Sequence, residues 1–337
     1  MFAKLIETLK ANPRTIVFTE GPDARILEAA AQLKKDGLYL TPILIGNVDT
    51  VKAKAAECGF DIEGLEIIDP ATYPEMEKMV ETMVELRKGK MSPEDCRANL
   101  LKGNYFGTML VKMGYADSLL GGATYSTADT VRPALQLIKC RKGAHLVSSS
   151  FILSREKDGK QELLAMGDCT INIDYQDTVD KEGNVTFTAA EKLAEVAIET
   201  AKTAKVFGID PKVAMLSYST KGSGKGANVD LVRNATALAK EMAPEFDIDG
   251  EMQFDAAVSP VVGQLKFPGS KVAGYANTFI FPEIQSGNIG YKIAQRLGGY
   301  AAFGPILQGL NAPINDLSRG CDAEEVYQMS IITAALA

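Results

Sequence analysis

Short β-branched segments alternate with helical segments along the first third of the chain, and this alternation restricts the possible folds more than any other feature. The segments TIVFTE, TPILIG and LEIID are followed by helical patterns over residues 23–36, from Val48, and over residues 74–88. Strands that alternate with helices form a mostly parallel sheet with helices against its faces. The sequence therefore predicts an α/β fold, with ligand sites outside the carboxyl ends of the strands.

The alternation is interrupted near Gly143 and then resumes. Two strand-like segments, AHLVSSSFIL and ELLAMGDC, follow the interruption and lead into a polar loop over residues 175–188. A long helical segment, AAEKLAEVAIETAKTA, comes next, and the strand VAMLSY follows it. A chain of 337 residues is also longer than one hydrophobic core usually serves. We therefore expect two α/β domains with a boundary near Gly143.

Composition and charge exclude several classes of protein. Apolar residues make up 46% of the chain and charged residues 23%, and there is no apolar run of the length that a membrane span needs. The opening residues MFAKLIETLKANP suit an amphipathic helix and lack the features of an export signal. A net charge of −7 disfavours broad binding to nucleic acid. We expect a soluble, cytoplasmic protein that binds neither nucleic acid nor membranes.

Cysteine and histidine usage restricts the chemistry further. The five cysteines form no CxxC pair, which argues against a disulfide framework and against a zinc site. The chain has one histidine, His145, so chemistry that needs two histidines is excluded. His145 lies in an apolar run, where a core or strand-edge position is the simpler interpretation and a general base the alternative. We expect no bound metal.

The segment NDLSRGCDAEE, residues 315–325, places an arginine in the turn before the last helix. The apolar run VYQMSIITAAL follows with its apolar positions on one face, and Asp322 is suited to cap the helix. The N-terminus of a helix attracts anions, and Arg319 adds a planar guanidinium at the same place. A phosphate or a carboxylate is therefore the expected ligand of this turn.

A glycine-rich segment, KGSGKG at residues 221–226, resembles a nucleotide-binding loop but departs from its pattern. A P-loop needs a glycine where this chain has Ser219 and a serine or threonine where it has Gly226. A glycine-rich turn with two lysines can still hold an anion through its N–H groups, and a solvated turn is the equal alternative. The first strand is followed by EGPDAR rather than GxGxxG, so a dinucleotide-binding domain is not supported.

Two further arginines lie near glycine residues. Arg87 stands in ELRKGK, a composition typical of a solvated helix end. Arg132 stands in GGATYSTADTVRP and, like Arg319, has small hydroxyl and glycine residues beside it. Such a composition makes a poor core but can surround a phosphate or an acyl oxygen. We therefore expect Arg132 and Arg319 to bind substrate.

Four ordered blocks carry a resemblance to the phosphate acetyltransferase (phosphotransacetylase) family that runs through nearly the whole chain: GGATYSTADTVRPALQLI, STKGSGKG, GNIGYKIAQRLG and GPILQGLNAPINDLSRGC. The family transfers an acetyl group between coenzyme A and phosphate. The resemblance implies two α/β domains with an interdomain cleft, an architecture similar to isocitrate and isopropylmalate dehydrogenases. The domains expected from it are residues 1–145 with 303–337, and residues 146–302. The chain resembles the short form of the family, without an extra N-terminal region.

The resemblance also implies roles for individual residues. Arg319 corresponds to the family's phosphate-binding arginine, and Ser318 to a serine that hydrogen-bonds the coenzyme A thiol or the reacting acyl group. Arg87 and Arg132 match arginines assigned to coenzyme A or substrate binding. The remaining candidates for substrate binding lie in the first and second of the four blocks: Ser126, Thr127, Lys221, Gly222 and Ser223. Coenzyme A is expected as a co-substrate, no cofactor as permanently bound, and a homodimer as the assembly.

Glu325 departs from the family pattern, in which the proposed base is an aspartate. It stands six residues after Arg319 and has a side chain longer by one methylene. Asp322 and Glu325 also have the spacing of a capping box, in which the acid at the third helical position accepts the N–H of the cap residue. Glu325 is therefore expected either as the catalytic base or as a cap alone. Asp316, in PIND, is expected to fix a turn through local backbone hydrogen bonds.

Several alternatives accompany this interpretation. A phosphate butyryltransferase differs only in a wider acyl pocket, and a non-catalytic sensor of coenzyme A or acyl phosphate retains the fold without turnover. A dehydrogenase of similar architecture needs a cluster of metal-binding aspartates that the sequence lacks. Cys169 or Cys321 acting as an acetyl carrier is a covalent alternative to direct transfer, which is what the family implies.

Overall fold

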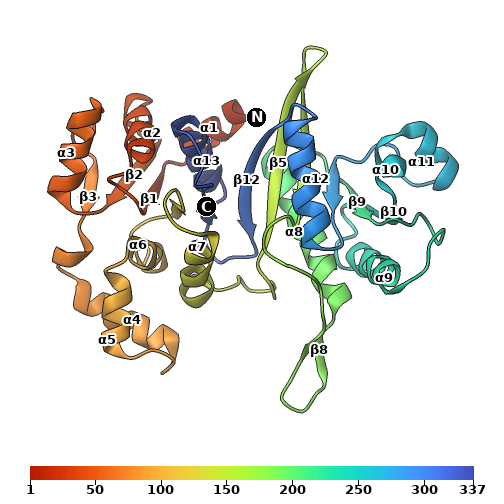
Figure 1. Cartoon of the computed structure of the whole chain (residues 1–337), viewed down its shortest axis with the longest axis horizontal. Helices are drawn as coiled ribbons and strands as arrows, with labels where there is room; N and C mark the ends of the chain where they lie inside the picture. Colours follow the sequence, from red (N-terminus) through yellow and green to blue (C-terminus); the bar gives the residue numbers. More distant parts are fainter. The chain divides into compact units, whose positions relative to one another are not determined.

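The computed structural model describes residues 1–337 and divides into two compact units. Unit 1 comprises Met1–Gly143 and Leu310–Ala337, and unit 2 comprises Ala144–Gly309 (Figure 1). Each unit is built on a sheet with helices against it, and most strand pairs are parallel. The predicted α/β class with mostly parallel sheets is therefore confirmed. No helix has the length and apolar character that crossing a membrane would require.

The sheet of unit 1 has five strands, all parallel. Their spatial order is β13 (Ile314–Asp316), β4 (Ser118–Gly121), β1 (Arg14–Phe18), β2 (Leu40–Ile45) and β3 (Glu66–Ile68). One group of helices lies on one side of this sheet (Figure 1): α1 (Phe2–Ala11), α2 (Ala24–Lys35), α3 (Val48–Cys58) and α13 (Ala323–Ala335). The other side carries α4 (Met76–Arg87), α5 (Pro93–Leu100), α6 (Gly103–Lys112) and α7 (Thr127–Pro133). Two short helical turns, η1 (Pro70–Thr72) and η2 (Ala134–Ile138), complete the unit.

Burial on both faces explains the apolar sequence of the central strand. Ile16, Val17 and Phe18 of β1 are completely buried, because helices cover the sheet on both sides. Helix α2 begins after β1, where the Asp23 side chain accepts the N–H of Arg25, as expected of an N-cap. It buries Ile26, Leu27, Ala29, Ala30 and Leu33 along one side.

The C-terminal segment supplies the edge strand of this sheet. β13 pairs in parallel with β4, and Asp316 lies opposite Gly121. β4 in turn pairs in parallel with β1. Parallel strands end at the same edge of a sheet, so the loops that follow β13, β4 and β1 are neighbours although they are far apart in the sequence.

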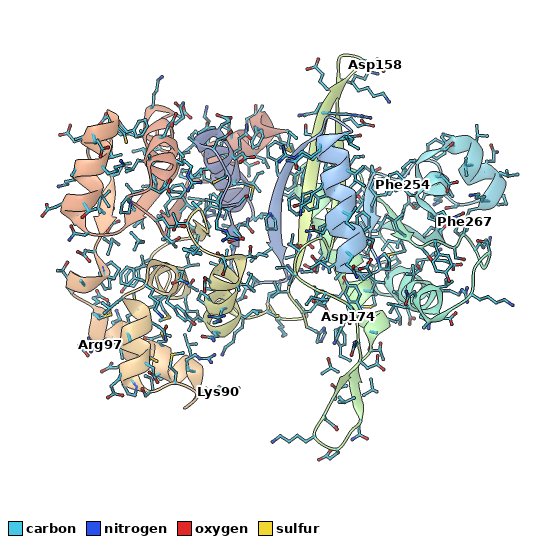
Figure 2. All side chains as sticks on the ribbon, viewed as in Figure 1. Lys90, Arg97, Asp158, Asp174, Phe254 and Phe267 are labelled. Carbon is cyan, nitrogen blue, oxygen red and sulfur yellow. The ribbon has the colours of Figure 1, made fainter.

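Unit 2 has a six-stranded mixed sheet. The order is β10 (Asp247–Met252), β9 (Lys212–Leu216), β11 (Thr278–Ile280), β6 (Lys160–Gly167), β5 (Ser148–Lys157) and β12 (Ala301–Gln308), and the last three pair antiparallel. Asp158 lies at the tip of the long β5–β6 hairpin (Figure 2). The other elements are the hairpin β7 (Thr178–Val179) and β8 (Val185–Phe187) and the helices α8 (Ala189–Val206), α9 (Ala227–Met242), α10 (Phe254–Val258), α11 (Pro260–Lys266) and α12 (Ile284–Arg296).

The core of unit 2 lies on both faces of this sheet. Along β9, Val213 and Met215 pack into the cluster formed with α8 and α9, whereas Ala214 and Leu216 pack into the cluster on the opposite face. Alternate residues of a strand point to opposite faces, so VAML buries all four side chains in two separate cores. The VAML part of the predicted strand VAMLSY is therefore apolar because both faces of β9 are covered.

The strands β10 and β12 were missing from the sequence-based prediction. β10 reads DIDGEM, which lacks an apolar run, and β12 contains a glycine and a proline. Because β12 pairs with β5 as far as Gln308, unit 2 extends to Gly309, whereas the expected domain boundary stood between residues 302 and 303. The loop expected over residues 175–188 holds the small β7–β8 hairpin.

Replacement of Phe106 by alanine tests the packing of unit 1. Phe106 of α6 is fully buried and meets Tyr73 edge-on at 5.1 Å between ring centroids. We expect Phe106→Ala to lower the free energy of unfolding by about 3–5 kcal/mol, since the cavity and the lost transfer free energy add. Urea unfolding followed by circular dichroism gives this value. Leu101→Ala, at an exposed side chain nearby, is the control, and an equal loss in both variants would contradict the packing described.

Candidate active site

Three loops meet at the carboxyl edge of the unit 1 sheet. They follow β1 (residues 19–23), β4 (residues 122–126) and β13 (residues 317–322), and we call them the three-loop cluster. Four of the residues predicted for the site, Ser126, Thr127, Ser318 and Arg319, lie in these loops or at the helix start that follows. The structure thus brings together the two sequence segments that were singled out for an anion.

Ser318 and Arg319 lie on the surface of the three-loop cluster. Both side chains are exposed, and the Arg319 guanidinium has no hydrogen bond or ion pair with an acid of the chain. The Ser318 hydroxyl accepts the N–H of Gly320 at 3.2 Å, and the Ser318 carbonyl accepts the N–H of Cys321 at 2.9 Å. The turn is therefore closed by hydrogen bonds among its own residues, and the arginine side chain is available to an external anion.

Arg25 fixes the backbone beneath this turn. Its Nη1 donates to the carbonyl oxygens of Arg319 at 3.0 Å and Cys321 at 3.1 Å, and its Nη2 donates to the carbonyl of Ala123 at 2.9 Å. Asp23 accepts two more hydrogen bonds from the same guanidinium, at 2.9 and 2.8 Å. One side chain therefore connects all three loops.

Glu20 makes a second connection between two of the loops. Its carboxylate accepts the N–H of Gly122 at 3.2 Å and the N–H of Thr124 at 2.8 Å. The hydroxyls of Thr19 and Thr124 also donate to it. Burial raises the pKa of Glu20 above its ordinary value, although these hydrogen bonds oppose the rise. Glu20 therefore holds the β4–α7 loop against the end of β1.

Asp316 connects β13 to the start of α7. It is buried, and its two oxygens accept hydrogen bonds from the hydroxyls of Thr127 at 2.6 Å and Thr130 at 2.5 Å. Burial raises the pKa of Asp316 to about 6, while both hydroxyls and the positive charge of Arg319 oppose the rise. Gly122, at φ +99, leaves room for this carboxylate, since a Cβ there would stand 2.2 Å from it. The expectation that Asp316 serves only a local turn is therefore wrong, because its partners lie on α7.

The hydroxyls of Ser126 and Thr127 are both used within unit 1. Ser126 donates to Asp129 at 2.7 Å, and Thr127 donates to Asp316. A hydroxyl that donates its proton to a carboxylate can only accept a hydrogen bond from a ligand. A fully ionised phosphate oxygen has no proton to give, so this geometry favours a role for both residues in orienting α7.

Arg87 and Arg132 lie near the same tyrosine, although they come from different helices. Burial raises the pKa of Tyr105, and the positive charges of Arg132 and Arg87 oppose this rise. The buried Nε of Arg87 has no hydrogen-bond partner. Arg132 is exposed and lies 3.7 Å from Asp129, a weak pair at the surface. Two guanidiniums with so little compensation form a second positively charged region of unit 1.

Glu325 takes part in the capping box that its spacing predicts. Its Oε2 accepts the N–H of Asp322 at 3.1 Å, and Asp322 accepts the N–H of Glu325 at 2.8 Å. The side chain is exposed, and only one of its two oxygens has a partner in the chain. Capping is therefore observed, and the second oxygen is available for another role.

The glycine-rich loop lies in unit 2 and surrounds a buried carboxylate. Glu251 accepts the N–H of Gly222 at 2.7 Å and the hydroxyl of Ser219 at 2.9 Å. Burial alone would raise the pKa of Glu251, but these donors and Arg233 lower it below its ordinary value. The hydroxyl of Ser223 accepts the N–H of Thr220. The N–H group of Gly222 and the hydroxyl of Ser223 are thus used inside the loop.

Lys221 is the member of this loop whose side chain is available. Its Nζ lies over the ring of Phe267 at 4.7 Å from the centroid. Phe267 follows α11 and is labelled in Figure 2. A cation over an aromatic ring keeps its charge and its three donors. Of the three residues predicted here for substrate binding, Lys221, Gly222 and Ser223, the lysine therefore has the most suitable geometry.

The alternative nucleophiles and bases have unsuitable surroundings. Burial raises the pKa of the Cys321 thiol to about 11, and burial also raises the pKa of Cys169 well above its ordinary value. Such thiols carry little thiolate near neutral pH. The His145 side chain is exposed rather than in the core, and its Nδ1 lies 3.0 Å from Glu195. No cluster of three or more potential metal ligands is present.

Sequence reasoning missed Glu20 and Arg25. Both stand in EGPDAR, which was considered only as a departure from a glycine-rich fingerprint. Their position directly after a buried strand was the signal that could have found them, since such loops carry the ligand sites of parallel sheets. Glu20 also lines a pocket of about 310 Å³, together with Lys102, Asn104 and Tyr125.

A parallel sheet with arginine- and hydroxyl-bearing loops at its carboxyl edge defines the class: an α/β protein equipped to bind an anionic substrate. The model of the family described as phosphate acetyl/butaryl transferase matches residues 1–334. The chain belongs to this family. Members use coenzyme A as a co-substrate.

Individual relatives are similar over their whole length. The phosphate acetyltransferase of Bacillus subtilis (strain 168) is 51% identical over 339 residues, with 100% of this chain and 99% of the relative covered. The phosphate acetyltransferase of Staphylococcus epidermidis (strain ATCC 12228) is 49% identical over 342 residues, covering 100% and 98%. Among solved structures, a phosphotransacetylase from Streptococcus pyogenes is 51% identical with a TM-score of 0.91, and the match covers 99% of this chain and 97% of that one.

The raised pKa of Asp316 predicts how Asp316→Asn changes the pH dependence of stability. Ionisation of Asp316 opposes folding, because its pKa rises from 3.8 in a free side chain to about 6 in the fold. The cost of this ionisation to the free energy of unfolding is absent below pH 3.8 and complete above about pH 6. The difference between the two pKa values corresponds to about 3 kcal/mol. Wild type should therefore lose stability relative to Asp316→Asn as the pH rises from 4 to 7 in urea titrations. A difference between the two proteins that stays constant with pH would contradict the burial described.

Proposed function

We propose that this protein is a phosphate acetyltransferase, which catalyses the reversible reaction acetyl-CoA + phosphate = acetyl phosphate + CoA. The observation that carries the proposal is the match over residues 1–334, with relatives of this name about 50% identical, together with an exposed and unpaired Arg319 beside Ser318. A phosphate butyryltransferase is not favoured, since the similar relatives are acetyltransferases. A non-catalytic sensor has no supporting observation.

Direct transfer is the mechanism that the surroundings of the cysteines support. The thiolate of coenzyme A attacks the acetyl carbonyl carbon of acetyl phosphate, a tetrahedral oxyanion forms, and the bond to the phosphate oxygen breaks as the thioester forms. A free thiol has a pKa near 8.5, so it is about a few per cent thiolate at neutral pH and benefits from a base. Burial raises the pKa of Cys321 to about 11, so an acetyl-cysteine intermediate is disfavoured.

Arg319 is proposed to bind the phosphoryl group in both directions. A guanidinium offers two parallel N–H donors to two phosphate oxygens, a geometry that an ammonium lacks. No acid of the chain forms an ion pair with it, and it stabilises the negative charge that collects on the departing phosphate. Ser318 is proposed to hydrogen-bond the thiol or the reacting acyl oxygen from the adjacent position.

Glu325 is proposed as the base, in addition to its observed role as a cap. One carboxylate oxygen accepts the N–H of Asp322, and the other is available to receive the thiol proton. Arg87 and Arg132 are proposed to bind the phosphates of coenzyme A, because both are positively charged and poorly compensated. Ser126, Thr127, Lys221, Gly222 and Ser223 complete the proposed substrate contacts, the first two through the orientation of α7.

Other features of the proposal rest on the resemblance. They are a dehydrogenase-like arrangement with a cleft between the two α/β domains, a location in the cytoplasm, and the absence of a permanently bound cofactor.

A homodimer is also proposed, and one apolar surface of unit 2 supports it. Ile289 and Ile293 of α12 and its C-cap residue Leu297 follow one another at spacings of four and are 58%, 53% and 84% exposed. Tyr291, in contrast, stacks on Phe151 of β5 at 4.0 Å between centroids.

The activity is tested by following coenzyme A thiol release from acetyl-CoA in the presence of phosphate. We expect wild type to be active, with higher activity towards acetyl-CoA than butyryl-CoA, and Arg319→Ala to lose about a hundredfold or more in kcat/KM. Glu325→Gln should lose about a hundredfold in kcat, because glutamine retains the capping box but cannot accept a proton. Glu324→Gln, one residue earlier and also exposed, is the control.

Each other outcome has a defined meaning. A nearly silent Glu325→Gln leaves Glu325 as a cap only. Higher activity towards butyryl-CoA makes the protein a butyryltransferase. A folded wild type that is inactive towards both thioesters removes the proposal of an enzyme.

The dimer is tested by light scattering after size-exclusion chromatography. Ile293→Glu places a charge in the middle of the apolar surface of α12, and desolvation of that charge in a dimer is unfavourable. We expect a dimer for wild type and a monomer for Ile293→Glu at micromolar concentration. Gln295→Glu adds the same charge to the same helix outside this surface and should remain a dimer. Two dimeric variants would exclude α12 as the interface.

A further inference from the structure

Arg25 uses every N–H donor that it possesses. Nε–H and one Nη2–H donate to Asp23, and the second Nη2–H donates to the carbonyl of Ala123. The two Nη1–H groups donate to the carbonyls of Arg319 and Cys321. A guanidinium has five such donors in a fixed plane, so these five bonds leave none for a substrate.

The charge of Arg25 is also balanced. Asp23 holds it through two parallel hydrogen bonds, and these bonds, with the charge of Arg25, lower the pKa of Asp23. Arg25 therefore differs from Arg319, whose guanidinium has no acidic partner in the chain. Of two arginines in the same cluster, one is paired and points at backbone, and the other is unpaired and exposed.

The bonds from Arg25 fall on both sides of the exposed arginine turn. The carbonyls of Arg319 and Cys321 enclose Gly320, and both are held by the same nitrogen atom. The other bonds of this turn are Leu317 N–H to the Gly121 carbonyl, at 2.7 Å, and the two closures made by Ser318. Without Arg25, the peptide plane that follows Cα of Arg319 would keep one hydrogen bond, from the Gly320 N–H to the Ser318 hydroxyl, and its carbonyl oxygen would have no partner.

We propose that Arg25 is a positioning residue for phosphoryl binding, which sets the direction in which the Arg319 side chain leaves the three-loop cluster. This inference rests on the proposed role of Arg319. It assigns to EGPDAR a function in the reaction without contact to substrate. A misplacement of about 1 Å at a substrate-orienting group can lower a rate about a hundredfold, so a distant backbone clamp can matter as much as a direct contact.

A positioning role for Arg25 differs from a purely structural role because its loss should impair the binding of one substrate, phosphate, and not of the other. Loss of the clamp disorders the phosphate-binding guanidinium, whereas Arg87 and Arg132 lie on other helices and keep their places. We therefore expect the KM for phosphate to rise while the KM for acetyl-CoA changes little. A general loss of folded enzyme would instead lower kcat in proportion to the folded fraction and leave both KM values unchanged.

The test compares wild type, Arg25→Ala, Arg25→Lys, Arg319→Ala and Arg14→Ala in the phosphate-dependent cleavage of acetyl-CoA. Arg14→Ala is the matched control, because Arg14 also donates a hydrogen bond within unit 1, to the main-chain oxygen of Ala337, and begins β1 at the end opposite to the cluster. We expect Arg25→Ala to lose about 10- to 100-fold in kcat/KM for phosphate. Arg25→Lys should restore little of this, since an ammonium has no planar fork to span three carbonyls. Millimolar guanidinium should restore part of the activity to Arg25→Ala and none to wild type.

The outcomes distinguish this inference from the proposed function. If Arg319→Ala retains wild-type kinetics, the role of Arg319 is wrong and the inference falls with it. If Arg319→Ala is impaired and folded Arg25→Ala has wild-type kcat and KM for phosphate, only the inference is overturned. Should Arg25→Ala fail to fold by circular dichroism, Arg25→Lys decides by the same criteria: wild-type kinetics in the folded lysine variant overturns the inference, and a selective rise in the KM for phosphate supports it.

Discussion

The hydrogen bonds of Arg25 are the interactions on which the arrangement of the candidate active site depends. Parallel pairing brings the ends of β13, β4 and β1 to one edge, but pairing alone leaves the loops beyond those ends unconnected. Arg25 joins all three loops, and Glu20 and Asp316 each join two segments of the same region. Hydrogen bonds to charged groups are about twice as strong as those between neutral groups. The hydrogen bonds of three ionisable side chains therefore hold the loops together, as strand pairing holds the sheet together.

The ion pairs of this region also determine which arginine keeps an unbalanced positive charge. Arg25 is paired with Asp23 through two hydrogen bonds, so its positive charge is balanced within the cluster. Arg319 has no acid beside it in hydrogen-bond contact. An anion that approaches the loops thus meets one exposed guanidinium on a backbone that is already fixed. Preorganisation of this kind avoids reorganisation at the moment of reaction, which is the main source of electrostatic catalysis.

Sequence reasoning located the exposed part of the site but not the part that supports it. Ser318 and Arg319 were predictable because a short polar turn before an apolar helix is visible in one continuous segment. Arg25 was not, because its partners are backbone carbonyls 98 or more positions away, and a carbonyl has no sequence signature. The fold shows the same contrast. The apolar strand β9 was predictable, whereas β10, which reads DIDGEM, becomes a strand only through pairing with β9.

Buried carboxylates organise the loops of both units, and this has a consequence for anion binding. Glu20 accepts loop N–H groups of Gly122 and Thr124, Glu251 accepts that of Gly222, and Asp168 accepts those of Thr170, Ile171 and Asn172. A loop whose N–H groups turn inward to a carboxylate cannot offer the same groups to a phosphate. P-loop-like recognition by backbone is thereby excluded for the N–H groups named, even where glycine is plentiful. The exposed guanidiniums of Arg319 and Arg132 are then better placed to bind a phosphate than these N–H groups are, which agrees with the absence of a nucleotide-binding glycine motif from the sequence.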